Sequence, residues 1–262
     1  MSEDGVNDQS FAHAAANAWG IIGGTGLDQL DGLRVEREEL MDTPYGATSA
    51  PLVYGHLGST PMVFLARHGT EHHIAPHRIN YRANIWALAQ RVKKVVAVAA
   101  VGGIRAEFAP REVIIPDQII DYTYGREHTF FDAEELKHID FTAPYAQSVR
   151  QALMAAASGA NARVYAYGCY GATQGPRLET TAEINRMERD GCDLVGMTGM
   201  PEAALARELE LAYGCCAVVV NEAAGRGPDV ITMDDIGAHL AAGMSVVRRV
   251  LAALSPANCS DL

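Results

Sequence analysis

Residues 21–30 read IIGGTGLDQL, and this stretch decides where the fold begins: a short apolar run stops at Gly-Gly-Thr-Gly. The run predicts a first strand, and the glycines predict a tight turn that lets another molecule approach the backbone. Three interpretations compete: a dinucleotide site, a phosphate pocket, or a turn without a ligand. A dinucleotide fingerprint needs Gly-x-Gly-x-x-Gly. Gly24 and Gly26 fit it, but Gln29 stands at the third glycine position, so this interpretation is the weakest.

Strand-like and helix-like segments alternate along the rest of the chain. Residues 51–69 predict a hairpin of two strands broken at Gly58, and residues 112–122 predict one further strand. Residues 93–104, KKVVAVAAVGGI, form an apolar run typical of a buried strand. Helical spacing is present in several segments, including the last long one, residues 232–254. We therefore expect an α/β fold with a mixed central sheet flanked by helices, and ligands at the carboxyl ends of the strands.

The chain has 262 residues, of which 48% are hydrophobic and 20% are charged, as in a folded domain with a full core. No long Gly-, Ser- or Pro-rich linker divides it. We expect a single domain over residues 19–256, preceded by a flexible extension over residues 1–18. The net charge of −11 disfavours nucleic acid and anionic membranes as partners, and no apolar stretch is long enough to cross a bilayer. Five cysteines without metal-ligand spacing, and the lack of a signal peptide, favour a reduced, cytoplasmic protein.

A cationic partner for the Gly-Gly-Thr-Gly turn follows a second apolar strand. Residues 64–68 read FLARH, so Arg67 and His68 stand at the strand end. An arginine offers a bidentate fork to phosphate, and the Thr25 hydroxyl donates a hydrogen bond to an oxyanion. The histidines that follow have no Cys, Asp or Glu residues at ligand spacing, so a polar loop is favoured over a zinc site. These residues together favour a phosphate pocket.

Seven short stretches stand in a characteristic order between about residue 19 and residue 254: GIIGGTGL, LARHG, NYRANIWAL, AAVGGI, TQGPRLETTAE, GMTGMPEAALARE and VVVNEAAG. Together they resemble the family of trimeric purine nucleoside phosphorylases and methylthioadenosine phosphorylases. The resemblance covers nearly the whole chain. No single stretch is decisive, but their order and spacing are highly specific.

The resemblance implies phosphorolysis, in which inorganic phosphate attacks the anomeric carbon of a purine nucleoside through an oxocarbenium-like transition state. It implies phosphate as a co-substrate, no metal or organic cofactor, and a homotrimer. Relatives that act on adenosine-type substrates carry Thr where this chain has Ala99, so one hydroxyl donor is expected to be missing here. The residues that the resemblance places around phosphate are Thr25, Arg67, His68, the backbone around Ala100, and Thr198.

The resemblance also locates the residues that choose the base. Relatives that act on 6-aminopurines have Asp at the positions of Asn221 and Ala223, and Ser at the position of Glu179. An Asn amide donates to O6 of hypoxanthine and accepts from N7–H, and a carboxylate accepts from N1–H. We therefore expect Asn221 and Glu179 to select a 6-oxopurine and, with His68, to be the catalytic residues. Leu178 is expected to pack on the purine face.

The sugar pocket is expected to be apolar at the 5' position. The resemblance places Met197 against the ribose. Met233 stands where ordinary 6-oxopurine nucleoside phosphorylases have a 5'-hydroxyl-binding His, and Ile236 follows one turn later. The expected reaction is therefore phosphorolysis of 5'-methylthioinosine to hypoxanthine and 5-methylthioribose 1-phosphate.

Four other functions remain open from the sequence. Two are enzymes of the same family: an inosine/guanosine phosphorylase, which needs a 5'-hydroxyl-binding His, and a methylthioadenosine phosphorylase, which the base-contacting positions oppose. From other classes, a dinucleotide-binding oxidoreductase and a catalytically silent nucleoside-binding module remain alternatives. Nicotinamide binding would indicate the former, and purine binding without turnover the latter.

Overall fold

The central strand of the protein is β7 (Lys94–Gly103), whose ten residues are buried but for one half-buried position. In the computed structural model, which describes residues 17–131, 136–227 and 232–255, β7 is parallel to both β1 (Trp19–Gly23) and β12 (Ala212–Glu222). It is antiparallel to β11 (Leu194–Gly196). Because neighbouring strands and helices cover β7 on every side, its sequence is almost continuously apolar, as predicted.

The main sheet has ten strands in the order β2-β5-β6-β1-β7-β11-β10-β9, and β12 pairs with both β7 and β8. Parallel and antiparallel pairs occur together, so the prediction of a mixed central sheet is confirmed. A separate two-stranded ladder joins β3 and β4. The remaining strands are β2 (Leu33–Glu39), β3 (Asp42–Thr43), β4 (Gly46–Ala47), β5 (Leu52–Leu57), β6 (Thr60–Ala66), β8 (Val113–Ile114), β9 (Gln118–Asp121) and β10 (Cys169–Ala172).

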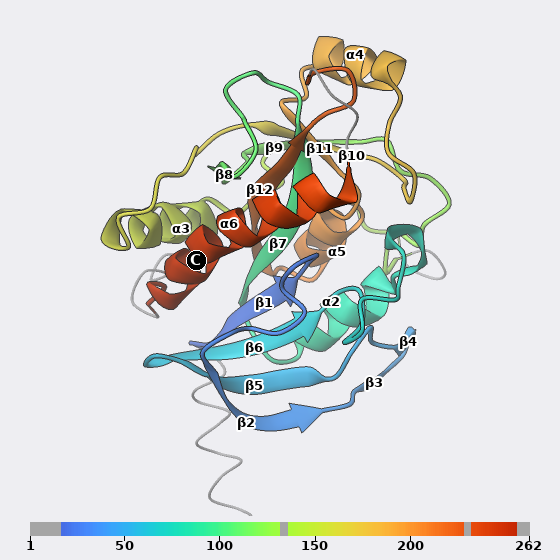
Figure 1. The fold of residues 1–262 in the computed structure, drawn as a ribbon. Helices are drawn as coiled ribbons and strands as arrows, with labels where there is room; N and C mark the ends of the chain where they lie inside the picture. Colours follow the sequence, from blue (N-terminus) through green and yellow to red (C-terminus); the bar gives the residue numbers. More distant parts are fainter. Residues whose placement is uncertain (1–16, 132–135, 228–231, 256–262) are drawn as a thin grey trace, which may run out of the picture.

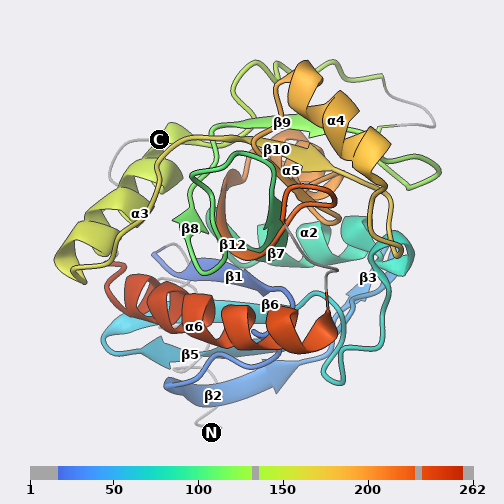
Figure 2. The ribbon, with the colours of Figure 1, turned by 45° about the horizontal axis from the view of Figure 1, so that its top comes forward.

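Helices cover both faces of this sheet, as Figures 1 and 2 show. Helix α6 crosses in front of β12 and packs against it with α3 beside it, whereas α2 and α5 contact each other behind β7. Thr180 begins α4 with a reciprocal capping box to Glu183, and Thr232 caps α6. The helices are η1 (Pro76–Arg78, a single 3₁₀ turn), α2 (Tyr81–Ala89), α3 (Gln147–Gly159), α4 (Thr181–Asp190), α5 (Glu202–Glu208) and α6 (Met233–Ala252).

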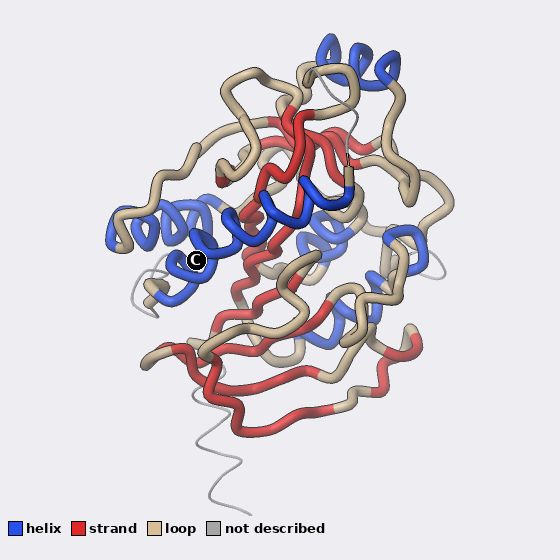
Figure 3. The backbone as a smooth tube through the Cα atoms, viewed as in Figure 1, coloured by secondary structure: helices blue, strands red, loops and turns tan. Residues whose placement is uncertain are grey.

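Two strand expectations need correction, and Figure 3 shows both regions in the colours of their secondary structure. The single strand expected over residues 112–122 is two short strands, β8 and β9, because Pro116 between them has no N–H for a ladder. Strand β2 was not expected. Its sequence LRVEREE is mostly charged and exposed, which suits an edge strand paired only with β5. The hairpin of β5 and β6 turns at Gly58 as predicted.

The ends of the chain lie partly outside the described residues. Of the extension predicted over residues 1–18, only residues 17 and 18 are described, and Ala18 is already buried. The described part of the predicted domain ends at residue 255. Among the helices described, none combines the length and apolar character that a membrane crossing requires.

The parallel strands bring four loops to one edge of the sheet. Strands β1, β6 and β12 run in the same direction as β7. The segments that leave β1 and β6 carry Thr25 and Arg67, and the end of β12 carries Asn221. This edge is where an α/β sheet usually binds its ligand.

Candidate active site

A cavity of about 340 Å³ opens at this edge of the sheet. It collects residues from the turn after β1, the loop after β6, the end of β7, the loop before α4, the segment after β11 and the end of β12. The predicted site residues that line it are Thr25, Arg67, His68, Ala100, Leu178, Glu179, Met197, Thr198, Asn221 and Ile236.

Two predicted site residues are not among those lining the cavity. Ala223 is buried in a small apolar cluster that includes Val195, and its N–H donates to the Gly103 carbonyl. Its neighbour Ala224 faces the cavity instead. Met233 is the first residue of α6, but its side chain lies outside what the structure describes.

The glycine turn lies against the arginine, as a phosphate pocket requires. A Cβ atom on Gly24 would stand 2.5 Å from the Val98 carbonyl oxygen and 2.9 Å from Nη1 of Arg67. Only glycine therefore allows the backbone to pass this close. Thr25, the next residue, is half-buried at the cavity wall.

Arg67 is 1% exposed, and its fork is already engaged by Glu202, the first residue of α5. Nε donates to Oε2 at 2.7 Å and Nη2 donates to Oε1 at 2.8 Å, while Nη1 donates to the Val98 carbonyl at 2.9 Å. The bidentate fork that we expected on phosphate is therefore formed with Glu202, whose counter-charge offsets the cost of burying this cation. One N–H on each Nη nitrogen remains for a ligand.

The sequence interpretation missed Glu202 and Tyr213. Glu202 is 1% exposed, and the Tyr213 hydroxyl donates to its Oε1 at 2.8 Å. Burial lowers the pKa of Arg67, but the charge and hydrogen bonds of Glu202 outweigh burial and raise that pKa above its ordinary value. The only local signal was an acidic residue in the first turn of a helix, which usually reflects the helix dipole rather than a buried ion pair.

His68 is 6% exposed, and its ring is neutral at pH 7. Burial, and to a smaller extent the Arg67 charge, lower the pKa of His68 to about 4. Its Nδ1 lies 2.8 Å from the Ile74 carbonyl, which only accepts, so Nδ1 carries the proton and donates. The other ring nitrogen, Nε2, is then an acceptor. In this tautomer Nε2 can accept a hydrogen bond from a protonated ligand oxygen.

A second imidazole connects the loop after β6 to the turn after β1. His72 also lines the cavity, and its ring centroid is 4.5 Å from that of His68. Its Nδ1 lies 2.9 Å from Asp28 Oδ1, and its Nε2 lies 3.4 Å from the Thr25 hydroxyl oxygen. The chain Asp28–His72–Thr25 therefore joins the loop after β6 to the turn after β1.

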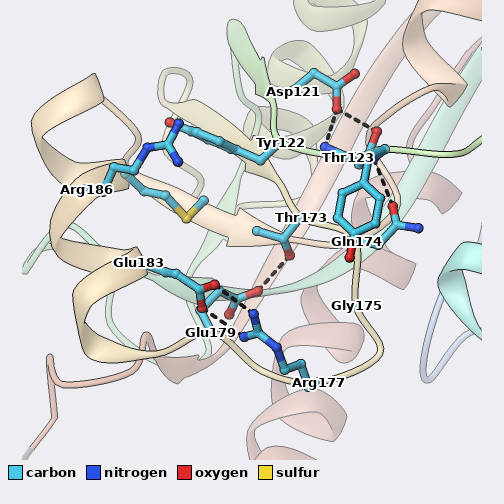
Figure 4. Close-up of a pocket in the computed structure, with 12 residues that line it drawn as sticks. Asp121, Tyr122, Thr123, Thr173, Gln174, Gly175, Arg177, Glu179, Glu183 and Arg186 are labelled. Atoms are coloured by element: carbon cyan, nitrogen blue, oxygen red, sulfur yellow. Dashed lines mark hydrogen bonds and ion pairs between the residues drawn. The ribbon is translucent and has the colours of Figure 1, made fainter.

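Glu179 is held in place by Thr173, at the end of β10. The Thr173 hydroxyl donates to Glu179 Oε1 at 2.7 Å, as Figure 4 shows. Glu179 also lines a neighbouring cavity of about 350 Å³, in which the adjacent Arg177 forms a bidentate pair with Glu183 (Figure 4). Because Arg177 is committed to Glu183, the second carboxylate oxygen of Glu179 keeps an acceptor site for a ligand N–H.

A β-bulge near the end of β12 orients Asn221. The register with β7 shifts between Val219 and Asn221, so Val220 is an extra residue. The bulge explains why Val220 and Asn221, which are consecutive, both line the cavity. Asn221 Nδ2 donates to the Glu222 carbonyl at 2.7 Å, which leaves one N–H and the amide oxygen for a ligand.

The apolar wall comes from three segments. Leu178 is 44% exposed and stands at the rim. Met197 is half-buried, and Ile236 comes from the first turns of α6. Thr198 is 7% exposed beside Met197. The cavity lining therefore contains both polar groups and aliphatic side chains, as a ligand with both characters requires.

Comparison with known proteins agrees with this geometry. The family model described as the phosphorylase superfamily matches residues 18–255. A protein of Pseudomonas syringae pv. tomato named probable S-methyl-5'-thioinosine phosphorylase is 52% identical over 243 residues, which are 92% of this chain and 99% of that protein. The 6-oxopurine nucleoside phosphorylase of Pyrococcus furiosus is 44% identical over 224 residues, 82% of this chain and 83% of that protein.

A solved structure extends the agreement to the fold. Methylthioadenosine phosphorylase from Schistosoma mansoni in complex with adenine superposes with a TM-score of 0.86 at 30% sequence identity, and the match covers 90% of each chain. The chain belongs to the phosphorylase superfamily. It is an enzyme of the purine nucleoside phosphorylase type, a pentosyltransferase with the single-domain mixed α/β fold of that class.

Proposed function

We propose that this enzyme cleaves 5'-methylthioinosine with inorganic phosphate, yielding hypoxanthine and 5-methylthioribose 1-phosphate. One observation carries the proposal: Asn221 and Glu179 line the same cavity as Thr25 and His68, with an aliphatic wall beside them. The relative from Pseudomonas syringae, whose name specifies this activity, supports the same substrate. The proposal uses phosphate as a co-substrate and no metal or organic cofactor.

In this proposal the nucleophilic phosphate is held mainly by neutral groups. The hydroxyls of Thr25 and Thr198, the backbone at Ala100 and the remaining Arg67 N–H groups donate to its oxygens. His68 Nε2 accepts from a protonated phosphate oxygen, which favours the singly protonated anion. A phosphate so held lies beneath the anomeric carbon and stabilises the positive charge that develops on the sugar.

The base leaves with extra electron density, and two side chains accommodate it. The Asn221 amide oxygen accepts from N7–H and its free N–H donates to O6, while Glu179 accepts from N1–H. An adenine presents an acceptor at N1 and would be repelled by the carboxylate. Because a mispaired base leaves buried polar groups unsatisfied, such a site discriminates strongly. Leu178 packs on the purine face and Met197 on the ribose.

The 5' pocket is assigned to Met233 and Ile236. Ile236 lines the cavity from α6, and an apolar lining favours a methylthio group over a hydroxyl. An inosine/guanosine phosphorylase remains the second candidate because the same base contacts serve it; the 6-oxopurine relative supports this alternative. We further propose, from the resemblance to the family, that the enzyme is a cytoplasmic homotrimer. Its four described cysteines are free thiols, as a reduced compartment requires.

The experiment that tests the proposal is phosphate-dependent cleavage of methylthioinosine, methylthioadenosine, inosine and adenosine side by side, with phosphate omitted as the control. Preference for methylthioinosine supports both the base and the sugar assignments. Preference for methylthioadenosine would overturn the roles of Asn221 and Glu179 but leave the phosphate subsite intact. Preference for inosine would overturn the apolar 5' pocket alone.

A further inference from the structure

A single buried arginine joins the walls of the cavity. Arg126, in the loop after β9, is 8% exposed and does not line the cavity. Among the described residues, none of its hydrogen-bond partners carries a charge: every one is a carbonyl, amide or hydroxyl oxygen. A cation buried among neutral oxygens is costly unless it satisfies them in a fixed arrangement. The arrangement around Arg126 therefore requires an explanation other than ion pairing.

The first set of contacts reaches the wall that holds the base. Nη2 donates to the carbonyls of Thr173 at 3.2 Å and Gln174 at 2.9 Å, and Nε donates to Gln174 Oε1 at 3.1 Å. Thr173 is the residue whose hydroxyl holds Glu179, as Figure 4 shows, and Gln174 follows it in the chain. One half of the guanidinium therefore fixes the segment that presents Glu179.

The second set reaches the ribose and phosphate walls. Nη1 donates to the carbonyl of Met197 at 2.9 Å and to that of Met200 at 2.5 Å. Met197 and its neighbour Thr198 line the cavity, and Met200 lies just before α5, which begins with Glu202. The other half of the guanidinium therefore fixes the segment that leads to the partner of Arg67.

A third connection passes through Tyr81. Arg126 Nη1 lies 3.2 Å from the Tyr81 hydroxyl, which itself donates to the Pro76 carbonyl at 2.9 Å. Pro76 also lines the cavity, and it begins η1 at the end of the loop after β6 that carries His72. The planar guanidinium thus spans three segments that are far apart in the sequence and meet at one ligand. A lysine has one ammonium nitrogen and cannot reach both sides at once.

We propose that Arg126 is a positioning residue that sets the distance between the base subsite and the phosphate subsite without touching either ligand. This inference rests on the proposed function, since it assigns the walls the roles given there. Each subsite keeps its own hydrogen bonds when Arg126 is changed. What changes is their relative placement, and errors of about 1 Å between reacting groups lower turnover by about 100-fold.

The test is Arg126→Lys, with the exposed Arg34→Ala as the matched control. The substrate is whichever of the four nucleosides the wild-type enzyme cleaves fastest. An error in the proposed base or sugar preference is then seen in the wild-type substrate profile and does not affect the comparison with the variant. Calorimetric titration with the purine base of that nucleoside counts the competent sites, and kcat is expressed per site. We expect Arg126→Lys to lower kcat per site by about 100-fold while both KM values change far less, and Arg34→Ala to behave as wild type.

Chemical rescue provides the second readout. Arg126→Ala leaves a space of the right shape for a guanidinium ion. Millimolar guanidinium should therefore raise the kcat of this variant at least about tenfold, whereas ammonium should not. Arg34→Ala and the wild type should not respond. Unchanged kcat per site in Arg126→Lys would overturn the proposal. So would a loss of sites in proportion to the loss of activity, because that pattern indicates a purely structural role. If Arg126→Ala does not fold, Arg126→Lys alone decides.

Discussion

Replacing Glu202 with Gln removes one charge from the buried pair that holds Arg67. Both side chains are 1% exposed, and the two N···O distances are 2.7 and 2.8 Å. In either orientation of the Glu202→Gln amide, its NH₂ faces an Arg67 N–H: Nε–H at the position of Oε2, or Nη2–H beside the Tyr213 hydroxyl at the position of Oε1. Breaking a buried pair and leaving its partner charged costs about 3–5 kcal/mol.

The measurement is thermal unfolding of the variant with and without inorganic phosphate. For a chain of this size that loss lowers the melting temperature by roughly 6–20 °C. Arg67 lines the cavity, so phosphate bound there as proposed would supply the missing negative charge. Phosphate should therefore raise the melting temperature of Glu202→Gln more than that of the wild type.

The matched control is Glu183→Gln. Glu183 forms an equally short bidentate pair with Arg177, but the two side chains are 42% and 68% exposed. Glutamine also preserves the capping box with Thr180. Glu183→Gln should cost less than about 1 kcal/mol. If Glu202→Gln were no more destabilising than Glu183→Gln, the Arg67 charge would not depend on Glu202, and our account of the phosphate subsite would be wrong.

Three further predictions concern titration and specificity. The folded state holds the pKa of His68 at about 4 against an ordinary 6.5, so the unfolded chain binds more protons than the folded chain between these pH values. The free energy of unfolding should therefore fall by up to roughly 3 kcal/mol as the pH falls from 6.5 to 4. In urea titrations at these pH values, His68→Gln should lack this part of the pH dependence. Asn221→Asp combined with Glu179→Ser should shift the ratio of kcat/KM values from hypoxanthine toward adenine nucleosides, and an unchanged ratio would refute the proposed base contacts. Met233→His should raise inosine turnover relative to methylthioinosine, and no shift would mean that another residue faces the 5' group.

The parts of the site that the sequence predicted are those with a local signature. The glycine turn, the Arg-His pair after β6 and the apolar run of β7 each depend on neighbours in the chain, and the structure has them at the expected elements. The Glu179 and Asn221 positions came from the resemblance to the family, which covers nearly the whole chain. Ala223 shows the limit of that method: its neighbour Ala224 faces the cavity, in the loop after the bulged end of β12, where a strict alternation of faces no longer holds.

The parts that the sequence did not predict depend on contacts between distant segments. Arg67 and Glu202 are 135 residues apart, and Arg126 reaches oxygens 45 to 74 residues away on either side. Nothing in the spacing of these residues distinguishes them from surface charges. Only the packing of α5 against α2 and β12, and of the loop after β9 against the segment after β11, makes them buried.

These long-range contacts change the electrostatics of the site, not only its shape. From the sequence, Arg67 reads as a cation that attracts phosphate, with His68 beside it. In the fold, Arg67 is neutralised by Glu202, and burial keeps His68 uncharged at pH 7. The net positive charge that Arg67 and His68 offer to a ligand is therefore much smaller than their residue types suggest. In the proposed function an anion is held through the geometry of mainly neutral donors, so we expect the residues that fix the walls, Glu202 and Arg126, to matter as much as those that line them.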